Sequence, residues 1–83
     1  MPNQKEDDFE EVFKVKSKYF YEKKIPVHIK FKAGYFRNGI ILELNSDFLI
    51  FDEFREGRMI IFFIEIDRLE EYKSKEENRE QHT

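Results

Sequence analysis

The chain has 83 residues, contains no cysteine and carries a formal net charge of −3 at pH 7. This length accommodates one small domain, and the lack of cysteine excludes a disulfide framework, a thiolate metal site and a cysteine nucleophile. Charged and hydrophobic residues each make up 40% of the chain, which is too apolar for a disordered protein. No apolar run reaches the roughly 18–20 residues of a membrane span, and the acidic N-terminus is unlike a signal peptide. We therefore expect a soluble, cytoplasmic domain stabilised by packing or by a partner subunit.

The charges are unevenly distributed along the chain. Residues 1–10 carry a net charge of −3, residues 11–40 carry +6 and residues 41–83 carry −6. The negative total argues against simple coating of nucleic acid. The basic block fits either a solvated helix and strand face or a surface that meets phosphate groups or another subunit.

A helical period begins at Asp8 and ends before Pro26, because the residue preceding a proline is driven out of the helical region. The polar residues 1–7 are predicted to be flexible. Apolar residues at helical spacing predict one face buried against the core. These residues are Phe9, Val12, Phe13, Tyr19 and Phe20. Tyr19, Phe20 and Tyr21 are interpreted as core contacts rather than as a binding platform.

After Pro26 the period changes to two, which predicts strands. Five strands are expected at residues 27–32, 35–44, 48–51, 59–64 and 67–72, with polar turns between them. Gly39 lies inside the second strand, where a glycine favours a sharp bend or the close approach of another backbone. The charged tail at 73–83 contains no apolar residue and is expected to be disordered or an exposed helix.

This order predicts a mostly β domain over residues 8–72. An N-terminal helix is followed by a five-stranded, strongly bent antiparallel sheet that forms a small barrel. A βαβ fold is excluded, since no helix separates two strands.

The third and fourth strands are apolar on both faces. An exposed apolar edge strand promotes aggregation unless it is paired or covered, so we expect edge-to-edge pairing with another copy in a closed ring. The alternative is a monomeric barrel whose fourth strand pairs internally on both sides. The predicted interface comprises Ile60, Ile61, Phe62, Phe63 and Leu69.

Several consecutive segments together carry a family resemblance. They are Ile25-Pro26 with the strand to Gly34, Phe36–Leu44 with its bend glycine Gly39, Asn45–Phe51, and Ile61–Leu69. In pattern and spacing they resemble the Sm-like family, which includes the Sm and LSm proteins and bacterial Hfq. The resemblance implies a bent, SH3-like barrel of five strands. It also implies homo-oligomeric rings of six or seven copies joined between strands four and five, with RNA bound near the pore.

Two departures from that family bear on RNA binding. Leu49 stands where typical members read a uracil edge with asparagine, and a leucine side chain cannot hydrogen-bond a base. Phe63-Ile64 replaces the family's cationic pair. Asn45 and Phe48 match the turn-opening and base-stacking positions, so stacking is retained. The resemblance therefore implies a largely incomplete pore site, and any RNA would bind elsewhere.

A second nucleic-acid candidate is a basic, aromatic stripe on the first hairpin. Cations interleaved with aromatic rings suit single-stranded nucleic acid through charge and stacking. The alternative is an ordinary solvent-exposed face. With the two turn positions above, the candidate residues are His28, Lys30, Lys32, Tyr35, Arg37, Asn45 and Phe48.

The sequence shows no catalytic triad and no phosphate-cradling glycine loop, so we expect neither an enzyme, nor a cofactor, nor a metal centre. The leading hypothesis is a ring-forming Sm-like protein that binds single-stranded RNA or acts as a scaffold in RNA metabolism. The alternative is a protein-interaction or structural module on the same fold that does not bind RNA.

Overall fold

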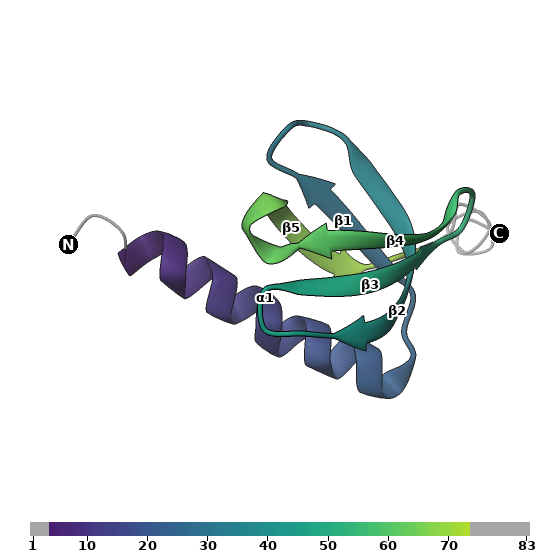
Figure 1. Ribbon diagram of the computed structural model, residues 1–83, viewed down its shortest axis with the longest axis horizontal. Helices are drawn as coiled ribbons and strands as arrows, with labels where there is room; N and C mark the ends of the chain where they lie inside the picture. The colour runs from purple at the N-terminus through teal and green to yellow at the C-terminus, as the bar shows by residue number, and fades with distance from the viewer. Residues whose placement is uncertain (1–3, 74–83) are drawn as a thin grey trace, which may run out of the picture.

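A long helix lies across one end of a strongly bent five-stranded sheet (Figure 1). This computed structural model describes residues 4–73, with side chains from residue 9 onward. The elements are α1 (Gln4–Lys23), β1 (Val27–Phe31), β2 (Phe36–Leu44), β3 (Phe48–Glu53), β4 (Gly57–Phe62), the 3-10 turn η1 (Phe63–Glu65) and β5 (Ile66–Glu71). The prediction of one helix followed by five strands is confirmed. The domain boundaries at residues 8 and 72 stay predictions, and most of the predicted tail lies outside the described residues.

Helix α1 is longer than predicted, because it begins at Gln4 rather than at Asp8. It ends in a left-handed residue, Lys24, with φ of 57°. The Ile25 amide then donates to the Phe20 carbonyl at 3.0 Å, which satisfies one of the carbonyls left free at a helix end. The helix therefore stops just before Pro26, as predicted. Its N-terminal half extends past the sheet (Figure 1).

The helix buries a narrower face than the sequence predicts. Phe13, Ser17 and Phe20, at i, i+4 and i+7, are buried against the sheet. The prediction that Phe9, Val12 and Tyr19 join the core is wrong, since all three are exposed. The neighbouring Tyr21 is also exposed. The helix approaches the sheet closely where the small Ser17 side chain lies. Of the apolar residues predicted for the buried face, only Phe13 and Phe20 lie on the same side of the helix as Ser17 and are buried.

The sheet is antiparallel throughout, with the strand order β4-β3-β2-β1-β5. Gly39 of β2 lies opposite both Val27 of β1 and Glu53 of β3, so the first half of β2 pairs with β1 and the second half with β3. The concave side of the bent sheet faces the helix and holds the core. Its buried apolar side chains from the strands and η1 are Val27, Ile29, Phe31, Ile41, Leu49, Phe51, Ile61, Phe63, Ile66 and Leu69.

The strongly bent five-stranded sheet predicted from the sequence is confirmed, and it is not closed within one chain. Within residues 4–73, no pairing joins β4 to β5, and each of these strands forms one edge of the sheet. The monomeric alternative, in which the fourth strand pairs on both sides, is therefore wrong. The turn η1 takes the chain from one edge of the sheet to the other, so neither edge pairs with another strand of residues 4–73.

Replacing Gly39 with alanine tests the close approach of β2 and β3. An added Cβ would lie 2.2 Å from the Asp52 carbonyl oxygen, which belongs to the backbone and cannot move aside cheaply. We expect Gly39→Ala to lower the free energy of unfolding by about 3 kcal/mol, measured by urea denaturation.

Gly57→Ala is the matched control. Gly57 has φ of 84° but open space around its Cα, so its replacement should cost about 1 kcal/mol of backbone strain only. Equal losses for the two variants would contradict the close contact at Gly39.

Candidate nucleic-acid interface

The outer face of β1, β2 and β5 brings cations and aromatic rings together. Directly opposed residues of an antiparallel pair share a face of the sheet. The strand register therefore places His28 beside Asn38 and Glu70, and Lys30 beside Phe36 and Arg68. Two of the predicted site residues, His28 and Lys30, thus lie on one face, and Phe36 lies on the same face as an exposed ring.

His28 is held in a fixed orientation on this face. Its Nδ1 donates to Asn38 Oδ1 at 2.6 Å, and its ring packs against Phe36 with centroids 5.1 Å apart. The other ring nitrogen, Nε2, is not used in this hydrogen bond. A groove of about 790 Å³ opens beside the ring, lined by His28, Phe36, Asn38, Glu70, Glu71, Tyr72 and Lys73. The groove therefore offers a ring face and several hydrogen-bonding groups to one ligand.

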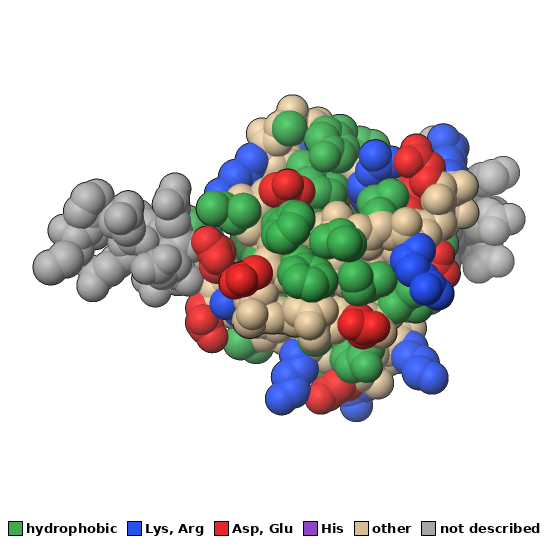
Figure 2. All heavy atoms as spheres, in the orientation of Figure 1, with side chains coloured by type: hydrophobic (Ala, Val, Ile, Leu, Met, Phe, Trp, Pro, Cys, Tyr) green, Lys and Arg blue, Asp and Glu red, His purple; other side chains and the backbone are tan. Residues whose placement is uncertain are grey.

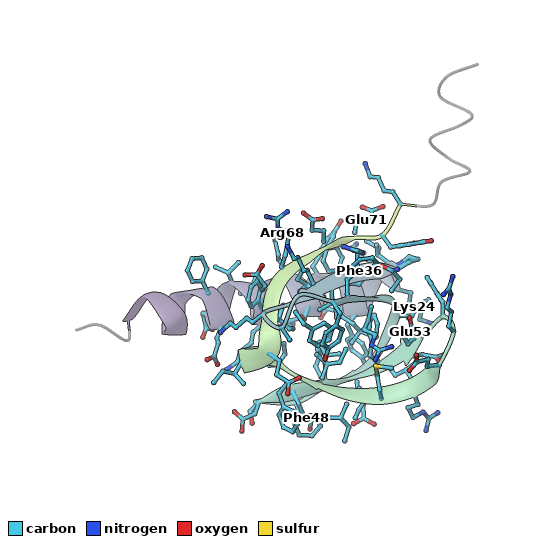
Figure 3. The ribbon with its side chains drawn as sticks, turned by 90° about the horizontal axis from the view of Figure 1, so that it is seen from above. Lys24, Phe36, Phe48, Glu53, Arg68 and Glu71 are labelled. Atoms are coloured by element: carbon cyan, nitrogen blue, oxygen red, sulfur yellow. The ribbon has the colours of Figure 1, made fainter. Side chains whose placement is uncertain are left out.

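This face carries charges of both signs, which the sequence prediction missed. β5 adds Arg68 next to Lys30, but it also adds Glu70 next to His28. Figure 3 shows Phe36, Arg68 and Glu71 on the same side of the molecule. Arg68 and Glu70 come from a strand about forty residues further along the chain, so only the pairing of β1 with β5 reveals them. A ligand here meets localised charges rather than a uniformly basic stripe.

Arg37 and Tyr35 do not belong to this face. Arg37 lies opposite Ile29, whose side chain is in the core, so Arg37 is on the other side of the sheet from His28 and Lys30. Its guanidinium forms a 3.0 Å ion pair with Glu56 and lies 5.5 Å from the centroid of the Tyr35 ring. Tyr35 in turn stacks on Phe31 at 4.6 Å. Arg37 is thus engaged within the chain, and the predicted grouping with His28 and Lys30 is wrong. Lys32 is exposed in the turn that follows β1.

The two turn residues, Asn45 and Phe48, lie away from the hairpin. Asn45 donates its amide to the Phe48 carbonyl at 2.9 Å and so closes the turn between β2 and β3. Phe48 points away from the side that carries Phe36 and Arg68 (Figure 3). The seven predicted nucleic-acid residues therefore do not form a single cluster. Leu49, at the base-reading position, is buried in the core.

One cation near η1 escaped the sequence analysis. Lys14 of α1 places its Nζ 6.0 Å from the centroid of the buried Phe63 ring. The cation at the Phe63-Ile64 position could not be predicted from the sequence, because a helix residue reaches this position only through tertiary packing. Ile64 itself is exposed.

An apolar patch covers the outer face of β3 and β4. Phe48 lies opposite Phe62 with ring centroids 5.6 Å apart, and Ile50 lies opposite Ile60. Figure 2 shows hydrophobic side chains gathered over these two strands. Ile60 and Phe62 are 57% and 44% exposed, so β4 is apolar on both faces, as predicted. Of the predicted interface residues, Ile61, Phe63 and Leu69 have buried side chains, so these side chains are not available to a neighbouring copy.

Glu53 organises the turn between β3 and β4. Its Oε1 accepts hydrogen bonds from the amides of Arg55 at 2.8 Å and Glu56 at 2.7 Å. The hydrogen bond from the Glu56 amide is the main reason that the pKa of Glu53 is below its ordinary value, because it stabilises the charged carboxylate. Residues 54–56 are therefore a short, closed turn rather than the longer loop predicted at 53–58.

Two kinds of site are not found in the described part of the chain. Among residues 4–73, no group of three or more histidine or acidic side chains is placed to hold a metal ion. In the same range, no helix is long and apolar enough to cross a membrane.

Comparison with known proteins identifies the fold. No protein-family model matches the sequence, and no curated protein matches it. Seven chains among solved structures match. One is a crystal structure of the pleiotropic translational regulator Hfq, with a TM-score of 0.62 and 16% sequence identity, covering 70% of this chain and 95% of the Hfq chain. The chain therefore has the Sm-like fold that the sequence resemblance predicted.

The Glu53 turn predicts a pH-dependent contribution to stability. Because the pKa of Glu53 is lowered on folding, its carboxylate stabilises the folded chain above its unfolded pKa of about 4.5. That contribution is lost as the pH falls through the lower, folded pKa. We expect Glu53→Gln to reduce the urea midpoint at pH 7, and the difference from the parent chain to shrink at pH 3.

Asp52→Asn removes the neighbouring, exposed carboxylate of the same strand and serves as the control. It should change the midpoint less than Glu53→Gln at pH 7. A Glu53→Gln difference that is the same at both pH values would contradict the role of the charged carboxylate.

Proposed function

We propose that this protein is an RNA-binding Sm-like protein that assembles with copies of itself into a closed ring of six or seven subunits. The observation that supports RNA binding best is the outer face of β1, β2 and β5, where an exposed Phe36 ring lies among Lys30, Arg68 and the His28–Asn38 pair. The likeness to Hfq supports this reading at the level of the fold.

The two open edges support assembly. In an antiparallel ladder, backbone groups point alternately to the two sides of a strand. The Phe63 amide donates to the carbonyl of Asp47, the residue just before β3, so the backbone groups of Phe63 face β3. By alternation along the strand, the backbone groups of Arg58, Ile60 and Phe62 point to the other side, the open edge. β5 forms the edge at the other end of the sheet, where the Leu69 carbonyl already accepts a hydrogen bond from the Lys16 amine at 3.3 Å. Pairing β4 of one copy with β5 of the next satisfies both edges, and repeating that contact closes a ring.

Single-stranded RNA fits the outer face better than duplex nucleic acid does. Phe36 is 58% exposed, and an exposed ring stacks on an unpaired base, whose faces are free. Lys30 and Lys32 are exposed and supply charge for the phosphates. Amide and imidazole groups of Asn38 and His28 supply hydrogen bonds to a base edge. The acidic Glu70 and Glu71 oppose indiscriminate phosphate binding, which favours recognition through bases.

Lys30 of this face and Lys32 of the adjoining turn are tested with a double substitution. We expect Lys30→Ala/Lys32→Ala to weaken binding of labelled oligo-U or oligo-A about tenfold at low salt. We also expect it to reduce the slope of log affinity against log salt by about 1.4, since each lost phosphate contact on a single strand removes about 0.7. Phe36→Ala should weaken binding with little change in that slope, because stacking is not ionic.

Lys18→Ala/Lys23→Ala removes the same charge from exposed positions of α1 and should bind RNA like the parent chain. RNA binding at this face is refuted if the parent chain binds neither oligonucleotide, or if the two double variants lose affinity equally.

The open β4 edge is tested with proline. Ile60 directs its amide to the open edge and exposes its side chain, so Ile60→Pro removes an outward donor while every bond to β3 is kept. We expect a folded chain that no longer forms rings, measured by light scattering and circular dichroism. Ile61→Pro is the matched control and should unfold the chain, because its amide faces β3. A ring that survives Ile60→Pro would contradict pairing through β4.

A second candidate function follows from the patch of Phe48, Ile50, Ile60 and Phe62. Edge pairing uses backbone groups, so it leaves this outward patch uncovered in a ring. A protein partner that buries the patch would make the chain an interaction module rather than an RNA binder. A defined partner recovered by pull-down after nuclease treatment, together with failure of the oligonucleotide titration, would favour this second function.

A further inference from the structure

We propose that α1 is a self-association element, whose exposed apolar stripe pairs in an antiparallel arrangement with α1 of a second copy. This contact is separate from the strand edges and does not require the proposed ring. The apolar stripe consists of the exposed residues Phe9, Val12, Val15 and Tyr19.

The stripe is unusual for a helix that already has a buried face. Phe13, Ser17 and Phe20 pack on the sheet, yet Phe9, Val15 and Tyr19 are 61%, 65% and 54% exposed on the same helix. Phe9, Val12 and Tyr19 follow the i, i+3, i+10 positions of a heptad seam, with Val15 beside them. A helix of this kind has two apolar surfaces, and the chain itself covers only one.

A shallow depression marks the middle of the stripe. It is lined by Glu11, Val12, Val15 and Lys16, and its lining is mostly apolar. The Lys16 amine donates to the Leu69 carbonyl at 3.3 Å, so its charge is turned toward β5 and its alkyl stem remains beside the valines. Lys16, at position i+7 of the heptad seam that starts at Phe9, is therefore compatible with apolar packing along the stripe.

The charges of α1 identify the occupant as a second copy. The helix has twenty residues. Its first ten contain one basic and five acidic residues, a formal charge of −4, whereas its last ten contain four basic and one acidic, a formal charge of +3. An antiparallel pair places each acidic half beside a basic half, while a parallel pair would place like charges together. The helix is therefore complementary to its own reversed copy, as a two-fold interface requires.

The same symmetry gives one specific contact. Glu11 and Lys18 are both exposed, and seven residues place them on the same flank of the stripe, about two turns apart. A pair centred between Lys14 and Val15 puts Glu11 of each copy opposite Lys18 of the other. Phe9 then packs near Tyr19 of the second copy, and Val15 lies at the centre of the contact.

A charge-swap series tests this contact by sedimentation equilibrium on the full chain in the Ile60→Pro background, which removes pairing through β4. We expect a monomer–dimer equilibrium for this background, and dissociation constants at least tenfold higher after adding Val15→Glu, Glu11→Lys or Lys18→Glu. The Glu11→Lys/Lys18→Glu double variant should regain the parental constant. A mixture of the two single variants should form heterodimers, because one copy then carries two cations and the other two carboxylates at these positions, and both ion pairs form between them.

The outcomes distinguish the helix pair from pairing through the strand edges. Should Ile60→Pro unfold, the same series is run on the parent chain, where loss of the helix contact halves the number of copies per particle. A mass that does not respond to Val15→Glu, or single and double charge variants that associate equally, overturns the helix pair whatever happens to the ring. If Val15→Glu abolishes association and Ile60→Pro leaves it unchanged, the helix pair is supported and the ring is refuted.

Discussion

The close approach of β2 and β3 at Gly39 is the constraint on which the fold depends. Gly39 is the one position of β2 that lies opposite residues of both neighbouring strands, Val27 and Glu53. A side chain at this point would collide with the Asp52 carbonyl, so only glycine lets one strand belong to both halves of the sheet. The bend brings the β3–β4 layer over the β1–β5 layer and encloses a core of about a dozen side chains between them and the helix. The bend also places β4 and β5 at opposite edges of the sheet. It directs the apolar outer residues of β3 and β4 away from the outer face of β1, β2 and β5.

Much of the fold was predictable because strand periodicity and turn chemistry are local. The alternation of Val27, Ile29 and Phe31 and the glycine turns identified the hairpin correctly, and the apolar third and fourth strands identified an incompletely covered sheet. The helix face was assigned less well. Apolar residues at helical spacing favoured the line through Phe9, Val12 and Tyr19, whereas the helix packs along the line through Ser17. The Ser17 hydroxyl is buried and has no hydrogen-bond partner in the described part of the chain. A polar residue in the contact line is invisible to a hydrophobic pattern, because what matters there is the small volume of the side chain.

The candidate site was predicted only in part, and the reason is register. His28 and Lys30 were assigned correctly to one face. Arg37 was not, because the hairpin turn places Phe36 opposite Lys30 and therefore Arg37 opposite Ile29, on the other side of the sheet. The two residues that β5 adds to the face, Arg68 and Glu70, could not be predicted from the sequence, because they reach it only through the pairing of the first strand with the last. The resulting surface combines a ring, an oriented imidazole and mixed charges, which suits discrimination between ligands better than the purely basic stripe would.

The open edges of the sheet also have a kinetic consequence for any head-to-tail assembly. Each copy that joins occupies one edge and presents the other, so an arc of any length retains two reactive ends and continues to grow. Growth stops only when the last copy meets the first, and the angle between β4 and β5 within one copy determines the number at which that happens. That angle is set by the bend of β2. A change in curvature at a single buried glycine would therefore alter the copy number of the closed assembly, or leave filaments that never terminate.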